Sequence, residues 1–152
     1  MSALRLCSTV TLGLLAGALA LEGIVLAPYW RSLRCDAFAN LHGGFGPRLY
    51  RFFAPLTIVA TLLPVVCAID VALSTPRTAS DWFTLISSVL AISLVGIYRL
   101  YFHSANQRLP ILAGQGAAVA LSMELSRWHR IHIARTVLCV EAFVLAALGV
   151  AI

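Results

Sequence analysis

The sequence predicts an all-α integral membrane protein, a bundle of four transmembrane helices in a single domain spanning residues 1–152. Three observations predict this fold class. Hydrophobic residues make up 61% of the chain and charged residues only 11%, whereas soluble domains carry about 25% charged residues. The mean hydropathy is +0.92. Four apolar runs are each long enough to cross a bilayer, which takes ~20 residues, and they leave no room for a separate soluble domain.

The predicted spans are residues 6–27, 52–73, 82–101 and 133–152. The first run is interrupted only by Glu22 and ends at Pro28-Tyr29-Trp30-Arg31, where aromatic and basic residues mark a membrane surface. A cleaved signal peptide is the alternative, because Arg5 precedes the run and Ala18-Leu19-Ala20 resembles a cleavage site. The run continues past that site to full span length, which favours a retained helix.

The connections differ in length. Residues 74–81 predict a short turn containing Pro76, whereas residues 28–51 and 102–132 form two long connections on one membrane face. We expect an amphipathic helical segment in each. Residues 30–41 form the first, and the glycine-rich residues 43–47 should break it. Residues 117–128 form the second, which lies along the surface or extends the fourth helix inward.

All eleven basic residues are Arg, and the formal net charge is +5. In a membrane protein we interpret them as anchors for anionic headgroups, so the expected partner is the lipid bilayer and no nucleic acid. The face with the long connections carries most of them, and the other face carries only Arg5 and Arg77. The positive-inside rule then makes the arginine-rich face cytoplasmic and both termini extracytoplasmic. The cysteines are scattered without a CxxC pair and are interpreted as small apolar fillers: Cys7, Cys35, Cys67 and Cys139.

Polar side chains from several predicted helices and loops gather in the layer next to that face. Ionisable groups in a bilayer are costly and need a partner or a purpose. The candidate catalytic residues are Glu22, His42, Asn106, His132 and Arg135. The candidate substrate-binding residues are Trp30, Tyr98, Tyr101, His103 and Trp128.

Helical spacing places several residues of the fourth predicted helix on one face. Trp128, His132, Arg135 and Cys139 follow at i, i+4, i+7 and i+11 and share one helix face. An inward Arg135 needs a carboxylate, and Glu22 has the matching depth, so we predict a Glu22–Arg135 pair. The alternative is that Arg135 snorkels to lipid phosphates. Glu141 is half a helix revolution from His132 and is expected in a different environment.

The segment Arg127-Trp128-His129-Arg130-Ile131-His132-Ile133-Ala134-Arg135-Thr136, followed by an Ala- and Leu-rich helix, resembles the last-helix motif of the anthrone-oxygenase-like family of small four-helix membrane proteins. Asn106-Gln107-Arg108-Leu109 is similar to the Asn-x-x-Leu element of that family, and Glu22 with Pro28 resembles its first-helix ending. The third run departs from the pattern, because it approaches Asn106 as Tyr-Phe-His-Ser-Ala without proline.

The resemblance implies oxidation of a tricyclic phenolic ketone, a small hydrophobic aromatic substrate, to a quinone with molecular oxygen and no evident cofactor. A neutral histidine such as His132 can remove an acidic benzylic proton, and Arg135 or Asn106 can stabilise the resulting oxyanion. Carried over residue by residue, the matched positions are Glu22, Asn106, Trp128, His132 and Arg135.

Two alternatives stay open. In the first, copper or iron is bound by His42, His103, His132 and Glu22. No pair of these residues has the i, i+4 spacing of a helical metal clamp. In the second, the chain is a non-catalytic membrane subunit that docks a partner protein or forms a homo-oligomer, with Gly13 and Gly17 offering a Gly-xxx-Gly contact.

Overall fold

The computed structural model describes residues 3–73 and 77–152, and the regular structure within these ranges is helical. Four helical stretches, Ala3–Ser32, Cys35–Ala72, Ala79–Gly114 and Ala118–Ala151, are each long and apolar enough to cross a membrane. The predicted all-α four-helix bundle is therefore confirmed. Pro76 of the predicted short turn lies outside the described residues.

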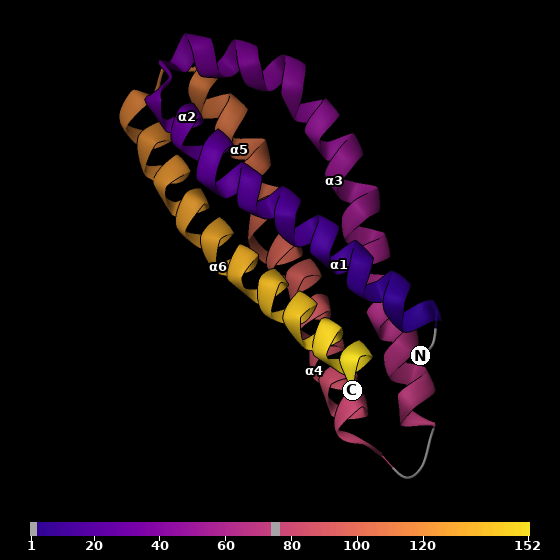
Figure 1. Ribbon diagram of the computed structural model, residues 1–152. Coiled ribbons are helices and arrows are strands. Elements are labelled where there is room, and N and C mark those ends of the chain that lie inside the picture. Colours follow the sequence, from indigo (N-terminus) through magenta and orange to yellow (C-terminus); the bar gives the residue numbers. More distant parts are fainter. Residues whose placement is uncertain (1–2, 74–76) are drawn as a thin grey trace.

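The four stretches lie side by side along one long axis (Figure 1). Helix α1 (Ala3–Leu21) packs on α3 (Cys35–Ala72) and on α6 (Ala118–Ala151), and α4 (Ala79–Ile97) packs on the same two helices. This arrangement closes a ring in which each helix has two neighbours. The beginning of α1 and the end of α6 lie at one end of the bundle, which we call the terminal end.

The first and third stretches each contain one π-helical turn before they reach the opposite end. Segment η1 (Glu22–Leu26) joins α1 to α2 (Ala27–Ser32), and η2 (Tyr98–Phe102) joins α4 to α5 (His103–Gly114). A π-turn is a rare widening of the helix that is frequent at functional sites. The two turns lie in the half of the bundle away from the terminal end, at the level where the polar residues were predicted to gather.

The long connections contain more continuous helix than predicted. The chain becomes extended at Leu33 and Arg34, with ψ angles of 148° and 159°. From Cys35, α3 continues without interruption through residues 43–47, so the predicted helix break there is wrong. Pro47 leaves one backbone hydrogen bond unmade, which bends a helix without ending it when the flanking turns are intact. Figure 1 shows the resulting bend of α3 over the bundle. Residues 118–128 extend the fourth helix inward, as one of the two predicted alternatives had it.

Buried apolar residues form two separate clusters along the axis. The cluster toward the terminal end, the terminal core, contains aliphatic and small residues: Leu12, Leu15, Ala16, Leu19, Ala60, Ala91, Leu94, Cys139, Ala142 and Ala146. The cluster at the other end, the aromatic core, contains Ala27, Phe38, Phe102, Ala105, Leu109, Ala113, Leu121, Leu125 and Trp128. All four cysteines are free, and Cys67 and Cys139 are buried as small fillers.

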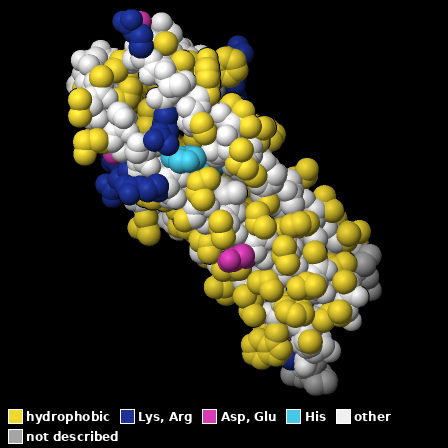
Figure 2. All heavy atoms as spheres, turned by 60° about the vertical axis from the view of Figure 1, so that its left-hand side comes forward, with side chains coloured by type: hydrophobic (Ala, Val, Ile, Leu, Met, Phe, Trp, Pro, Cys, Tyr) yellow, Lys and Arg dark blue, Asp and Glu magenta, His cyan; other side chains and the backbone are white. Residues whose placement is uncertain are grey.

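The outer surface of the bundle is apolar, as a lipid-facing surface requires. Leu14 is 60% exposed and Val89 66% exposed, although both lie in the middle of their helices. Figure 2 shows hydrophobic side chains covering the long body of the molecule, with Arg side chains gathered in its upper part. Together with the four long apolar helices, this surface identifies an integral membrane protein.

Candidate functional site: a cavity beside the two π-helical turns

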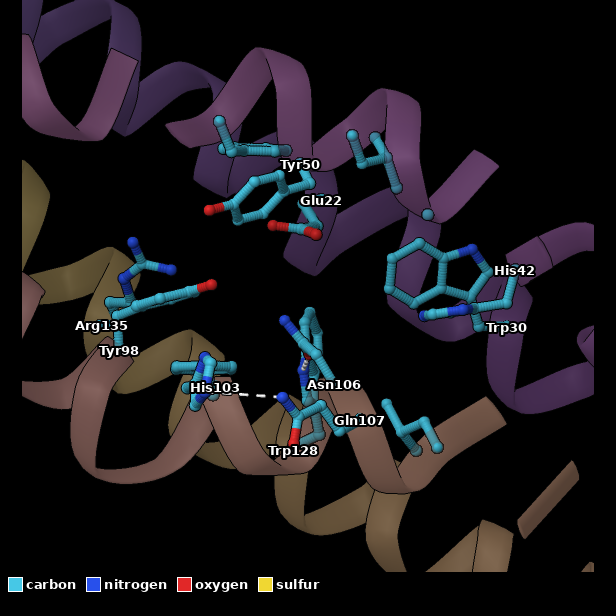
Figure 3. Close-up of a pocket in the computed structure, with 15 residues that line it drawn as sticks. Glu22, Trp30, His42, Tyr50, Tyr98, His103, Asn106, Gln107, Trp128 and Arg135 are labelled. Atoms are coloured by element: carbon cyan, nitrogen blue, oxygen red, sulfur yellow. Dashed lines mark hydrogen bonds between the residues drawn. The ribbon is translucent and has the colours of Figure 1, made fainter. Parts of the chain in front are cut away.

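A cavity of about 330 Å³ lies in the half of the bundle that holds the π-helical turns. Its lining comes from all four helical stretches and combines ionisable, amide and aromatic side chains (Figure 3). The lining residues are Glu22, Trp30, His42, Gly46, Leu49, Tyr50, Phe53, Tyr98, Phe102, His103, Asn106, Gln107, Leu109, Trp128 and Arg135. Eight of them belong to the ten sequence-predicted site residues, whereas His132 and Tyr101 do not line the cavity.

His132 lies directly behind the cavity wall and is fully buried. Its Nε2 lies 2.9 Å from the carbonyl oxygen of Leu19. A carbonyl can only accept, so Nε2 carries the hydrogen, and Nδ1 of the neutral ring is left as an acceptor. This Nδ1 has no hydrogen-bond partner and lies 3.8 Å from a carboxylate oxygen of Glu22. Glu22 therefore connects the cavity to His132.

The contact between η1 and α6 at His132 requires a glycine at position 23 of η1. A Cβ added at Gly23 would lie 3.0 Å from Cδ2 of His132 and 3.2 Å from Cδ1 of Ile133. Those distances are too short for an ordinary contact, so the imidazole would have to move. Gly23 thus sets how closely η1 approaches α6, and with it the distance between Glu22 and His132.

Trp128 holds the next part of the wall. Its indole stacks on the His132 ring, with centroids 4.7 Å apart and planes 6° apart. Edge contacts from Trp30 and Phe102, at 5.6 and 5.3 Å, fix the indole from two other helices. The indole Nε1 donates to Oδ1 of Asn106 at 2.9 Å. This bond fixes the amide orientation and leaves the NH₂ group of Asn106 as a donor on the cavity side, where Figure 3 shows it.

Arg135 is the only arginine lining the cavity among the described residues, and its side chain is buried. Its guanidinium carbon lies 5.4 Å from the Phe102 ring centroid and 5.9 Å from that of Tyr98, which are cation–π distances. Its Nε has no hydrogen-bond partner. The predicted Glu22–Arg135 ion pair is not formed, although both side chains face the same cavity (Figure 3). The Glu22 carboxylate lies 3.8 Å from Nδ1 of His132 instead. The cavity thus contains a buried cation with unused donors.

The remaining predicted residues divide between the cavity rim and the outside. His42 packs on Phe38 at 5.4 Å, and His103 lies 3.5 Å from the side-chain nitrogen of Gln107. Both histidines line the cavity. Tyr101 points away, because its hydroxyl lies 3.5 Å from Glu124 and Arg127 covers its ring. Tyr101 and Phe102 are adjacent in the sequence, and of the two only Phe102 lines the cavity.

The residues do not fit the proposed metal site. Within residues 3–73 and 77–152, no three His, Cys, Asp or Glu side chains lie close enough together to hold a metal ion. His132 uses Nε2 on a backbone carbonyl, and His42 and His103 line other parts of the wall. We therefore derive no chemistry from a bound metal.

Sequence reasoning missed several lining residues, above all Gly46, Leu49, Tyr50 and Phe53 of α3. Gly46 belongs to the glycine-rich residues that were interpreted as a helix break, and the other three follow them. A continuous α3 places Gly46, Leu49, Tyr50 and Phe53 at i, i+3, i+4 and i+7, which is one helix face. That spacing was present in the sequence as a signal.

Fold and cavity together define a class: a small four-helix membrane protein with a polar and aromatic cavity in one half of the bundle. Comparison of the chain with protein-family models, curated proteins and solved structures finds no match.

Proposed function

We propose that this protein is a membrane oxygenase that oxidises a flat, lipid-soluble aromatic ketone of the anthrone type with molecular oxygen. One observation carries the proposal: a cavity with aromatic walls contains both a buried carboxyl, Glu22, and a buried guanidinium, Arg135, that do not neutralise each other by direct contact. Its volume of about 330 Å³ lies at the lower end of the range for small-molecule sites. The sequence resemblance to the anthrone-oxygenase-like family points to the same reaction.

The substrate chemistry needs a base and an oxyanion site on opposite sides of one ring system. The base removes a proton from the ring methylene, and the electron pair moves onto the ketone oxygen to give an enolate. Molecular oxygen then adds to the former methylene carbon, and its O–O bond breaks. One oxygen atom remains on the carbon as the new ketone, and the other leaves as water with the two methylene hydrogens.

We assign proton removal to Glu22 and place His132 behind it as a positioning residue. Glu22 lines the cavity, whereas the imidazole of His132 is closed off from it. The free Nδ1 at 3.8 Å can orient the carboxyl and accept a hydrogen bond from its protonated form after a small movement. This assignment revises the direct role that the sequence suggested for His132. His42, which also lines the cavity, is the second candidate base.

Arg135 and Asn106 are assigned to the enolate oxygen. A buried, preorganised charged donor stabilises a developing oxyanion more strongly than a donor in water does. The NH₂ group of Asn106 is oriented by the bond from Trp128, so it needs no reorganisation during the reaction. Tyr98, Trp30 and Phe102 supply the flat apolar walls for the rings.

We also propose that the cavity half faces the cytoplasm and that both termini are extracytoplasmic. The proposal rests on the arginines of α2, α3, α5 and the beginning of α6, against only Arg5 and Arg77 near the terminal end. A single cysteine placed at Arg34, which precedes α3 and is exposed, should react with a membrane-impermeant maleimide only after cells are opened. Labelling of intact cells would contradict this orientation.

Oxygen uptake tests the function. Purified protein in detergent should consume oxygen with anthrone as the probe substrate and release the quinone. Glu22→Gln should lower kcat/KM about 100-fold, which is the scale of losing a general base. Glu141→Gln is the matched control, because that carboxyl lies exposed on the outer face of α6, and it should retain activity. No oxygen uptake, together with a stoichiometric co-purifying protein, would support the non-catalytic subunit instead.

A further inference from the structure

Glu141 of α6 stands out from the rest of the lipid-facing surface. It is exposed and lies eight residues after Ile133 and ten before Ala151, hence about 12 and 15 Å from the two ends of the apolar part of the helix. Within the described ranges its carboxyl forms no hydrogen bond and no ion pair. A carboxyl at the centre of a bilayer is costly unless a partner satisfies it.

Among the described residues, an acidic side chain exposed in the middle of a helix is found only on α6. The exposed middle of α1 carries Val10 and Leu14, and that of α4 carries Ile86 and Val89. Asp70 of α3 lies only two residues before the helix ends and has an interaction of its own. Glu141 is thus the one acidic side chain that the described part of the chain presents to the middle of the lipid.

The residues around Glu141 form a stripe with heptad spacing. Ala134, Val137, Glu141, Val144, Leu148 and Ala151 follow one another at alternating steps of three and four, and all six are exposed. This is the a and d pattern of a two-helix seam, in which Ala134, Glu141 and Leu148 take the a positions. We call these six residues the Glu141 stripe. A polar residue at a single a position fixes the register of such a seam.

We infer that the Glu141 stripe is the contact surface for a second copy of this chain. Copies inserted in the same orientation can only pair about a two-fold axis along the membrane normal, which sets the two α6 helices parallel. In a parallel seam, residues at the same a position face each other, so Glu141 meets Glu141 of its partner. Two carboxyls of which at least one is protonated satisfy each other by hydrogen bonding. The neighbouring Val137 and Val144 supply close apolar packing.

The inference is independent of the proposed oxygenase function, because the Glu141 stripe lies on the outer face of α6 and none of its residues lines the cavity. A failure of the dimer leaves the oxygen-uptake experiment unaffected, and an inactive protein leaves the dimer testable. The two hypotheses are therefore separated by different variants and different readouts.

Cysteine cross-linking in lipid vesicles provides the first test. The full chain is prepared with Cys7, Cys35, Cys67 and Cys139 replaced by Ala, and one new cysteine is introduced by Val144→Cys or, as the control, Val89→Cys. Both positions are exposed in the middle of a span, at 45% and 66%. Oxidation should give a disulfide-linked dimer for Val144→Cys and monomer for Val89→Cys. Equal cross-linking of the two variants, or none for Val144→Cys, would overturn the proposal.

Association measured by energy transfer between labelled copies in vesicles provides the second test. Interhelical hydrogen bonds in membranes contribute modest free energies, so Glu141→Leu should weaken association by about 3- to 30-fold. Glu141→Gln should associate as well as the wild type, because two amides can also bond to each other. Wild-type association in Glu141→Leu would show that the carboxyl does not hold the dimer together. A loss in Glu141→Gln equal to that in Glu141→Leu would overturn the proposed hydrogen-bonded seam, because an amide pair would then not replace the carboxyl pair.

Discussion

The two halves of the bundle solve the burial of polar groups in opposite ways. At the terminal end, each buried side-chain polar atom of the described residues has a partner. Arg5 pairs with Asp81 at 2.6 Å, and Ser87 donates to the carbonyl of Ala142 at 2.7 Å. In the cavity half, Nδ1 of His129, Nδ1 of His132 and Nε of Arg135 are buried without hydrogen-bond partners. Satisfied networks rigidify a structure, whereas unsatisfied buried groups cost stability and are retained where something else uses them. The comparison favours the terminal half as the scaffold and the cavity half as the candidate site.

Packing follows the same division. Leu12, Leu15 and Leu19 are completely buried among small residues of α3, α4 and α6 in the terminal core. The aromatic core instead surrounds its charged neighbours with large rings held edge to face. The aromatic half holds a cavity of about 330 Å³, whereas the terminal half packs closely, as protein interiors generally do.

Arg135→Gln should give the largest effect and sharpen the contrast. The loss of a charged oxyanion donor should lower kcat about 100- to 1000-fold in the oxygen-uptake assay. The melting temperature should not fall, because the substitution removes a buried charge that has no carboxylate partner. Arg77→Gln, near the terminal end, is the control and should keep full activity. A strong fall in melting temperature with unchanged kcat would make Arg135 structural.

Leu15→Ala tests the terminal half, where we expect a loss of stability without a loss of activity. It should lower the free energy of unfolding by about 2 kcal/mol, because it removes close packing that lipid cannot replace, while the transfer term is small in a bilayer. Activity per folded molecule should be unchanged. Its neighbour Leu14 is 60% exposed to lipid, so Leu14→Ala should cost less than about 0.5 kcal/mol. Equal losses for both variants, measured by denaturation in detergent, would show that burial in the bundle does not decide stability here.

Gly23→Ala should give the smallest of these effects. Gly23 lies in η1, between the terminal core and the aromatic core. Its new methyl group would displace the His132 ring, and overpacking of this kind typically costs about 1 kcal/mol or more. We expect kcat to fall about tenfold through the changed geometry at Glu22. Gly17→Ala is the matched control, since no atom lies within 4 Å of an added Cβ there. That variant should be active and slightly more stable. If the two alanine variants behave alike, the close approach at Gly23 has no functional role.

The sequence predicted the fold well because hydropathy over ~20 residues depends little on tertiary detail. The polar layer was also predictable, since Glu22, Asn106 and Arg135 all lie at matching depths in their helices. Two features required three-dimensional information. The continuity of α3 through Gly43, Gly44 and Pro47 runs against the local propensity of these exposed residues. Glu22 lies at the cavity and His132 behind it. This difference depends on the ring stacking of His132 on Trp128, of which the i, i+4 spacing indicated only the shared helix face, and on the close approach of Gly23, which has no signal in a single sequence.

The two π-helical turns have a consequence for how the halves are joined. A π-turn accommodates one additional residue, which rotates every later side chain by about 100° relative to an uninterrupted α-helix. The first and third stretches therefore each carry two rotational frames, one that points leucines into the terminal core and one that points Ala27 or Ala105 into the aromatic core. Inward-facing residues on one side of the π-turn can therefore be substituted without changing which residues face inward on the other side. The scaffold and the site are thus separately adjustable parts of the same two helices.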